Sequence, residues 1–355
     1  MTMKMPYFVL YPKNDFPFLI PPLKHCLTTH ALCTNGLQPA NTTLYWMEIS
    51  DYFCFLALPV IISFAFVTEI ISIIVLSKQI RMSLDTYLLG LSIATILLIS
   101  CTVVLVLQHY IGYHPVLTYI QGYAISCRDW FWYTTIWLIV MMSFERALTV
   151  SATRSNTLCT SAQAGVVVVM VFCVGLVSAL PRFWEYAATD VFDSSHNVTV
   201  LISEKTESTT TPEYNTMYFW YVKTITLFLP YFMMLSISVT LSCRTRRSTM
   251  TRRYMSVKHS SGLTLNRKIK EEIALSKLLI LIISVYVIFT TPFCLLDLLA
   301  YALPGWISSD SRMFASLYNL FSVSFFLHHA LHLILYFCYN KQFRLTLLAL
   351  CCCCC

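Results

Sequence analysis

Seven long apolar segments constrain this chain more than any other feature of its sequence. A helix needs about 20 predominantly apolar residues to cross the roughly 30 Å hydrocarbon core of a bilayer. Segments of that length recur along the chain between short polar linkers, and we expect each of them to be a membrane-spanning helix. The segments are 54–77, 86–108, 126–150, 162–181, 217–241, 273–301 and 313–338.

The composition excludes a water-soluble fold. Hydrophobic residues make up 57% of the chain, charged residues only 12%, and the mean hydropathy is +0.67. A soluble domain with these values would expose large apolar patches, and a membrane barrel would show short alternating segments instead. We predict an all-α membrane protein, with an extracellular segment (1–53), a seven-transmembrane helix bundle (54–338) and a cytoplasmic amphipathic helix with a cysteine-rich tail (339–355).

The distribution of basic residues predicts the topology. An odd number of crossings puts the two ends of the chain on opposite sides of the membrane. Nine Lys and Arg and no acid lie between Arg244 and Lys270, and the positive-inside rule makes such linkers cytoplasmic. The N-terminus is then extracellular at the plasma membrane, and the glycosylation sequons at Asn41 and Asn197 fall outside. Membrane topology accounts for the net charge of +7 without nucleic acid as a partner.

The basic linker and the tail have further interpretations. The linker anchors the topology by attracting anionic lipid, or it also forms a docking surface for an intracellular partner. The tail, from Lys341 to Arg344 onwards, predicts a short helix on the inner membrane surface. Its closing cysteines are candidates for palmitoylation, namely Cys351, Cys352, Cys353, Cys354 and Cys355. In the N-terminal segment, Cys26 and Cys33 could form a disulfide in an oxidising compartment.

Short motifs across residues 50–345 resemble those of rhodopsin-like, class A G-protein-coupled receptors. The third span ends Glu145-Arg146-Ala147, where the class has Asp/Glu-Arg-Tyr, and Pro230 and Pro292 match the prolines of the fifth and sixth spans. Within the class, the chain is most similar to the vertebrate orphan group that responds to aromatic amino acids. The motifs that carry this similarity are Tyr87-Leu88-Leu89, Thr135-Ile136-Trp137, Pro181-Arg182-Phe183-Trp184 and Lys341-Gln342-Phe343-Arg344.

The resemblance implies a receptor that activates a heterotrimeric G protein of the Gq or Gi family and needs no cofactor or covalent chemistry. In the class, the arginine at Arg146 is held by its acidic neighbour Glu145 and released towards the G protein, and Tyr336 belongs to the same switch. On residues alone, Arg146 could also be a side chain that only marks the membrane edge. Pro230 and Pro292 are expected to kink their helices.

Several positions depart from the class and put the details of activation in doubt. Thr95 replaces an aspartate of the second span, Thr290 replaces a tryptophan, and His332 lies where the class has Asn-Pro-x-x-Tyr. Glu69 occupies the position of an asparagine in the first span. We expect a central polar cluster of Glu69, Thr95, Thr135, His328 and His332.

Two hypotheses concern the histidines of this cluster. Glu69 faces His332 inside the bundle, or each makes separate hydrogen bonds to hydroxyls or backbone. His328 and His332 are four residues apart, as in a metal-binding pair, but we found no third ligand at metal-site spacing and expect no metal.

Candidate ligand-binding residues lie near the extracellular ends of the spans. Mixed charge with aromatic side chains suits a small zwitterion or a short peptide, although Arg128 and Asp129 could also simply mark the membrane boundary. In the aromatic-amino-acid group, the position of Arg128 is acidic and that of Phe293 is an arginine, so the same ligand is not assumed. The candidates are Arg128, Asp129, Tyr133, Lys223, Phe293 and Asp297.

Other protein classes are weaker alternatives. A transporter or channel would show inverted repeats, broken helices or a ring of charges along a pore, and we found none of these patterns. The motifs of membrane enzymes are also missing from the sequence, so we do not expect an enzyme. A seven-helix receptor that has lost G-protein signalling stays open because of Thr95, Thr290 and His332.

Overall fold

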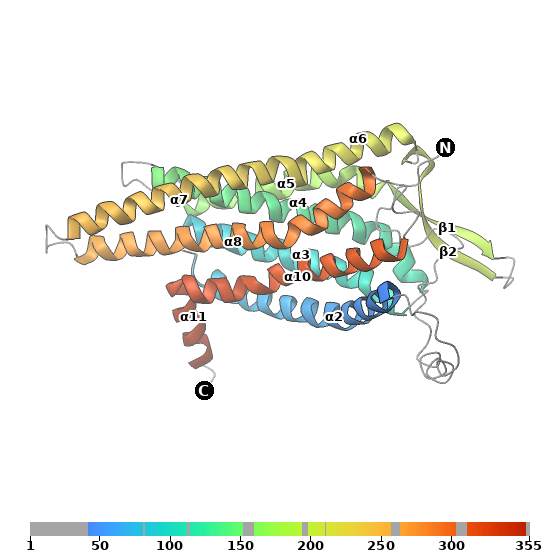
Figure 1. Cartoon of the computed structure of the whole chain (residues 1–355), viewed down its shortest axis with the longest axis horizontal. Helices are drawn as coiled ribbons and strands as arrows, with labels where there is room; N and C mark the ends of the chain where they lie inside the picture. Colours follow the sequence, from blue (N-terminus) through green and yellow to red (C-terminus); the bar gives the residue numbers. More distant parts are fainter. Residues whose placement is uncertain are drawn as a thin grey trace. The chain divides into compact units, whose positions relative to one another are not determined.

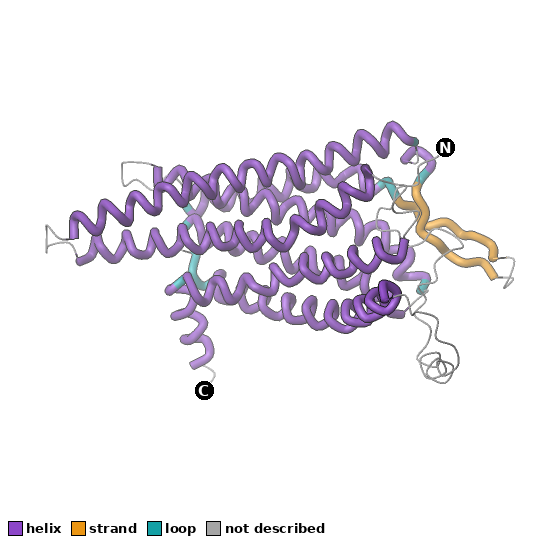
Figure 2. Tube along the Cα trace, viewed as in Figure 1, coloured by secondary structure: helices purple, strands orange, loops and turns teal. Residues whose placement is uncertain are grey.

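The computed structural model describes residues 42–80, 82–111, 114–151, 160–193, 198–209, 211–256, 263–302 and 311–352. Most of these residues are helical (Figures 1 and 2). The helices are α2 (Thr42–Ser77), α3 (Ser83–Ile111), α4 (Pro115–Ser151), α5 (Ser161–Phe183), α6 (Pro212–Lys223), α7 (Leu229–Ser256), α8 (Leu263–Ala302), α10 (Ser311–Tyr339) and α11 (Lys341–Cys352). The strands are β1 (Tyr186–Asp193) and β2 (Val198–Lys205).

The seven expected spans each lie within these helices, and the protein is a seven-helix membrane protein. Six segments of the described chain are long and apolar enough to cross a membrane by length and composition alone. The seventh span is α4, whose 37 residues reach about 55 Å at 1.5 Å per residue. Its charged and aromatic residues lower its hydropathy, because Trp and Tyr count as weakly apolar. The fifth span combines α6, a π-helical segment (Thr224–Phe228) and α7.

Helix α5 shows how one helix separates a lipid-facing side from a packed side. Val166, Val169, Val174 and Val177 are 58–66% exposed, as expected where lipid replaces water around the protein. The opposite face carries small residues, which allow close helix packing in membranes. Gly175 is the tightest of them, since a Cβ built there would lie 2.6 Å from Thr134 Oγ1 in α4.

The chain divides into two compact units. The larger comprises Pro59–Thr291 and Ser324–Cys355, and the smaller comprises Met1–Leu58 and Pro292–Val323. In the larger unit, α4 is central and packs against α3, α5 and α7. In the smaller unit, Phe293 and Tyr318 pack with their ring centroids 5.0 Å apart.

The segment 182–216 contains a β-hairpin, which the sequence analysis treated only as a long loop. Strands β1 and β2 pair antiparallel, from Tyr186 opposite Lys205 to Asp193 opposite Val198. The hairpin contacts α4, and Figure 1 shows it at the end of α4 and α5 that is remote from α11. Gly122 permits this contact, because a Cβ there would lie 3.0 Å from Tyr186 Cβ.

Two local features follow from proline and asparagine. The π-helical segment Thr224–Phe228 ends two residues before Pro230, whose missing N–H interrupts the normal hydrogen-bond ladder. At the other end of the larger unit, Asn340 Oδ1 accepts a hydrogen bond from the Phe343 amide at 3.1 Å and caps α11. Helix α11 then turns away from α10 (Figure 1), as expected for a membrane-surface helix.

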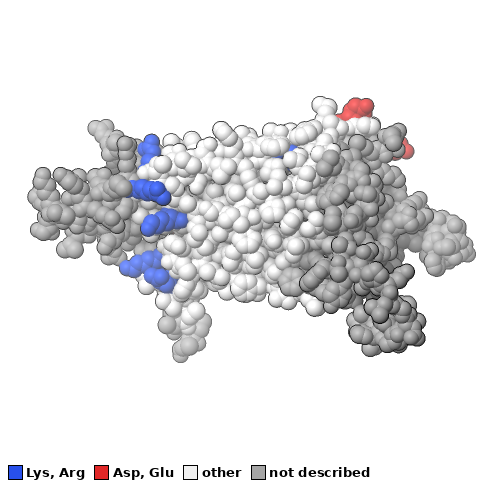
Figure 3. Space-filling model, in the orientation of Figure 1, with Lys and Arg blue, Asp and Glu red and all other residues white. Residues whose placement is uncertain are grey.

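Charged side chains are unevenly distributed along the larger unit. Figure 3 shows most of the visible Lys and Arg near the ends of α7 and α8 that are remote from the hairpin, and the visible Asp and Glu at the hairpin end. Among the side chains of this unit that the structure describes, the exposed basic residues are Lys78, Arg244, Arg246, Lys277 and Lys341. The apolar middle is therefore bordered by a basic end.

Candidate functional site

A buried ion network connects α4, α5 and the hairpin. Arg182, in the last turn of α5, lies at its centre. Its Nε is 3.1 Å from Asp129 Oδ2 in α4, and its Nη1 is 2.5 Å from Glu185 Oε2. Asp129 also accepts from Arg128, whose Nη2 lies 2.8 Å from Asp129 Oδ1. Ion pairs this well buried tie their helices together, since breaking one strands a charge away from water.

Lys205 extends the network to the second strand of the hairpin. Its Nζ lies 2.7 Å from Glu185 Oε1, and the Thr206 amide donates to the Glu185 carbonyl at 3.0 Å. The ion pairs described here join three cations to two carboxylates. Arg128 and Lys205 are the most exposed members, with side chains 15% and 24% exposed. These two cations therefore lie at the partly exposed edge of the network.

Aromatic side chains surround the network. The Arg182 guanidinium lies over the Tyr218 ring, 5.3 Å from its centroid, and Tyr133 packs with Tyr218 in one cluster together with Trp130 and Trp132. Burial raises the pKa of Tyr186 to about 12, although the nearby charge of Arg182 acts to lower it. Tyr186 is therefore a neutral phenol at physiological pH. The site therefore combines partly exposed cations, Arg128 and Lys205, with a neighbouring cluster of aromatic side chains.

The structure brings together only some of the predicted ligand residues. Arg128 and Asp129 belong to the network, Tyr133 to the aromatic cluster, and Lys223 is buried with its Nζ 5.3 Å from the centroid of the Phe219 ring. Phe293 and Asp297 belong to the smaller unit. Asp129 is already bound by two arginines, so its carboxylate neutralises charge within the protein.

Sequence reasoning missed three members of the network. Arg182 appeared only within a family motif, while Glu185 and Lys205 lie in segment 182–216, for which the sequence predicts a loop. A cation directly after the proline that ends a span was the available signal for Arg182. The positions of Glu185 and Lys205 depend on the hairpin register.

The central polar cluster contains the contact that we hypothesised between the first and seventh spans. His332 Nδ1 lies 2.9 Å from Glu69 Oε1, and both side chains are almost fully buried. The other carboxylate oxygen, Glu69 Oε2, is buried and has no hydrogen-bond partner among the described residues. Glu69 is therefore paired in the interior, and the functional role of this pair stays a prediction.

The other expected members of the cluster bond mainly to their own helices. Thr135 donates to the Trp132 carbonyl at 2.8 Å, and His328 Nδ1 bonds the Phe325 carbonyl. Thr95 is buried, and its hydroxyl has no hydrogen-bond partner within the described part of the chain. The structure adds His329, which the sequence analysis missed. His329 is 2% exposed, and its ring lies close to those of Phe325, His328 and His332.

The predicted switch residues lie at the basic end of the larger unit. Ser83, at the start of α3, donates a hydrogen bond to Glu145 Oε1. Arg146 is 4% exposed, and Tyr336 is fully buried between His332 and Phe343, with ring centroids 6.0 and 5.6 Å away. Tyr336 therefore connects the histidine cluster to α11.

A protein-family model matches residues 68–336, well over half of the chain, and it describes a 7 transmembrane receptor (rhodopsin family). The chain belongs to the rhodopsin family of receptors. None of the curated proteins matches this receptor. The match spans the central cluster, the buried ion network around Arg182, and Arg146. The receptor is a multi-pass protein of the plasma membrane.

Several predicted sites of the receptor lie outside the described residues or side chains. These are the sequons Asn41 and Asn197, the cysteines Cys26 and Cys33, and the tail cysteines Cys352, Cys353, Cys354 and Cys355. Cys351 is described and exposed on α11. Glycosylation, the disulfide and palmitoylation stay predictions.

Proposed function

We propose that this receptor binds an extracellular ligand at the ion network of Arg128, Asp129, Arg182, Glu185 and Lys205, here called the outer network. It would activate a heterotrimeric G protein through the end that carries Arg146. The observation that carries the proposal is the buried ion network, whose partly exposed cations Arg128 and Lys205 lie beside an aromatic cluster. Family membership supports signalling by conformational change, with no catalysis by the receptor itself. The hairpin end is then extracellular and the basic end cytoplasmic.

The charge distribution supports this orientation. The exposed cations Lys78, Arg244, Arg246, Lys277 and Lys341 lie in the linkers and helix ends that the positive-inside rule assigns to the cytoplasm. The N-terminus is then outside, and α11 lies along the inner leaflet with its cysteines available for palmitoylation.

The ligand is proposed to carry an anionic group and an aromatic or apolar part. Arg128 and Lys205 offer charge-assisted hydrogen bonds to a carboxylate, and Tyr133, Tyr218 and the neighbouring tryptophans offer apolar contact. A zwitterionic amino acid or a short peptide with a free C-terminus has this chemistry. The orphan group that responds to aromatic amino acids is the relative proposed from the motifs, with a different charge arrangement at Arg128 and Phe293.

Coupling to the Gq or Gi family is proposed from the same resemblance. Arg146 is the proposed contact with the G protein, with Glu145 and Tyr336 as its neighbours in the switch. The helices that contain Pro230 and Pro292 are proposed to bend at these prolines and so to allow the movement that exposes this end.

G-protein dissociation assays in transfected cells test the proposal. Cells expressing the receptor are exposed to aromatic amino acids, their carboxamides and short peptides with free or amidated C-termini. We expect free carboxylates to activate and amides to be weaker. Arg128→Gln should lower potency about 10- to 100-fold, the loss of one charge-assisted hydrogen bond. Arg146→Ala should abolish dissociation at unchanged surface expression.

Arg246→Ala is the matched control at the inner end, because Arg246 is exposed and carries the same charge. It should signal almost as well as the unmodified receptor. A receptor that reaches the surface but is silent towards every ligand and every G-protein family would contradict the proposal and favour a receptor without G-protein signalling.

A further inference from the structure

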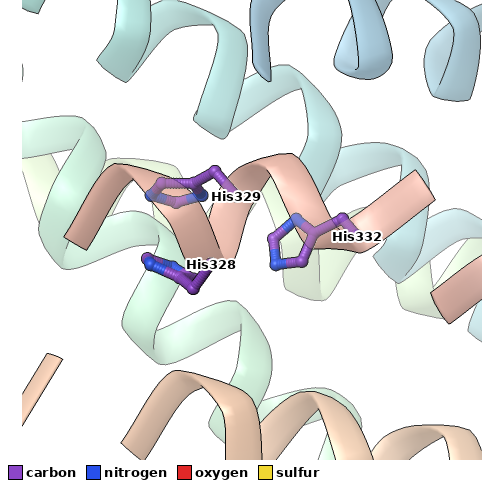
Figure 4. Close-up of side chains that lie close together, drawn as sticks. All are labelled: His328, His329 and His332. Carbon is purple, nitrogen blue, oxygen red and sulfur yellow. The ribbon is translucent and has the colours of Figure 1, made fainter. Parts of the chain in front are cut away.

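Three buried histidines of α10 lie together in the larger unit: His328, His329 and His332 (Figure 4). Their side chains are 1–2% exposed, and one ring nitrogen from each lies within 4.8 Å of one from both others. The rings of His328 and His329 are adjacent, with centroids 3.7 Å apart, and His332 lies further along the helix. Sequence spacing suggested only a pair, and His329 supplies the third nitrogen ligand.

His329 has no role in the structure as described. It is 2% exposed, and neither Nδ1 nor Nε2 has a hydrogen-bond partner among the described residues. Buried polar groups in folded proteins normally have a partner, because an unpaired group keeps the full cost of leaving water. A metal ion bound to either nitrogen would supply the missing partner.

The other two histidines are oriented as metal ligands usually are. His328 Nδ1 bonds the Phe325 carbonyl, which only accepts, so Nδ1 carries the hydrogen and Nε2 keeps its lone pair. His332 Nδ1 bonds the Glu69 carboxylate at 2.9 Å. In a neutral ring that donates from Nδ1, Nε2 keeps its lone pair, as in His328. Histidines that bind metals commonly donate their second N–H to a carbonyl or a carboxylate in this way.

We propose that His328, His329 and His332 bind one transition-metal ion of the Zn²⁺ type, with Glu69 as a positioning carboxylate behind His332. Imidazole nitrogens suit zinc and the neighbouring transition metals, whereas hard cations such as Na⁺ and Mg²⁺ prefer oxygen. Three histidines leave a fourth coordination position for water or another small ligand. The buried negative charge of Glu69 offsets part of the charge of the ion.

The surroundings of the site exclude bulk water. Phe325 and Tyr286 present ring edges or faces to His328, with centroids 5.4 and 5.5 Å away, and Tyr336 stacks on His332. Glu69 belongs to α2 and the histidines to α10, so an ion held here would strengthen the link between these two helices. The site shares no residue with the outer network and is independent of the proposed ligand.

Metal retention by the purified full-length receptor tests the proposal. The receptor carries a tag without histidine, and Cys351 to Cys355 are replaced by serine to remove competing thiols. It is equilibrated with Zn²⁺ in detergent, separated from free metal by gel filtration and analysed for zinc by mass spectrometry. We expect one zinc per chain and a zinc-dependent increase in the unfolding temperature, because a ligand that binds only the folded state stabilises it.

His329→Leu separates loss of metal from loss of fold. Leucine removes the unpaired nitrogens, so the metal-free variant should unfold at the same or a higher temperature, with no retained zinc and no zinc-dependent shift. Glu69→Gln should keep the site but weaken affinity about 10- to 100-fold, as for other carboxylates behind a histidine ligand.

His114→Asn is the control, since His114 is exposed at the start of α4 and outside the cluster. It should retain zinc like the parent. Co²⁺ absorption distinguishes nitrogen from thiolate ligands and should show nitrogen. The proposal is overturned if the parent retains no zinc, if His329→Leu retains as much as the parent, or if the bound Co²⁺ has thiolate ligands.

Discussion

At the scale of single residues, most of the polar chemistry of this receptor is internal. Arg182 contacts two buried carboxylates and one aromatic ring, and Glu69 contacts one histidine. Charged groups this deep are expensive to bury and persist in the membrane only with partners. The sequence analysis singled out Glu69, whereas Arg182 appeared there only within a family motif, and the partners of both depend on tertiary contacts.

Replacing Arg182 is expected to destabilise the receptor strongly. Arg182→Ala leaves Glu185 and Asp129 with fewer cations in a buried site, and removing one member of such a group costs about 3–5 kcal/mol. Thermal unfolding of the purified receptor in detergent measures the effect. Arg246→Ala is the control, because Arg246 is exposed, and equal shifts for the two variants would contradict the role of the network.

The pairing of Glu69 with His332 is expected to appear as energetic coupling. A double-mutant cycle of Glu69→Gln and His332→Asn, measured by thermal unfolding with a metal chelator present, should give a coupling of about 0.5–3 kcal/mol. The same cycle on G-protein activation tests whether the pair affects signalling. Strictly additive effects in both measurements would remove the pairing as a functional contact.

At the scale of elements, the helices of the larger unit pack through small residues. Gly175 and Ala179 on α5 face α4, while the valines on the other side face outwards. The alternation of small and large residues along α5 is visible in the sequence. The sequence does not show which helix packs against the face of α5 that carries the small residues, because any neighbouring helix could do so. Only the packed structure identifies α4.

Enlarging Gly175 is expected to disturb the contact between α4 and α5. Gly175→Ala would place its Cβ 2.6 Å from Thr134 Oγ1 and 3.4 Å from the Trp130 carbonyl oxygen, and Thr134 is held by its own hydrogen bond to that carbonyl. Overpacking costs about 1–3 kcal/mol, more than the helix propensity of alanine returns.

Gly165→Ala is the control on the same helix. The nearest atom to its Cβ would be Thr86 Cγ2 at 4.0 Å, so alanine should fit and stabilise the helix by up to about 1 kcal/mol. Unfolding temperatures of the two variants should shift in opposite directions. A lower unfolding temperature for Gly165→Ala than for Gly175→Ala would show that the contact is looser than the structure indicates.

At the scale of the whole molecule, the odd number of crossings determines that the two ends of the receptor face opposite sides. Epitope tags at both ends of the chain test this in intact and permeabilised cells. We expect the N-terminal tag to be stained in intact cells and the C-terminal tag only after permeabilisation. Staining of both tags from one side of intact cells is incompatible with seven crossings and with the proposed signalling.

The sequence by itself determined the number and place of the helices, because each apolar segment must satisfy its backbone hydrogen bonds internally once it is in lipid. It also identified the positions of Arg146, Glu69 and His332, since charged residues within apolar segments are conspicuous. It also placed Pro230 and Pro292 in the fifth and sixth spans, where they match the prolines of the receptor class.

Only the tertiary structure decided which of these groups meet. The network of Arg182, Glu185 and Lys205 depends on the register of a hairpin in a polar segment without helical periodicity. The third histidine, His329, directly follows His328 in the chain. The sequence analysis considered only residues four apart, such as His328 and His332, and therefore did not include His329. The periodicity of a helix or strand determines on which side of that element a side chain lies. Contacts between elements far apart in the chain depend on how the helices pack.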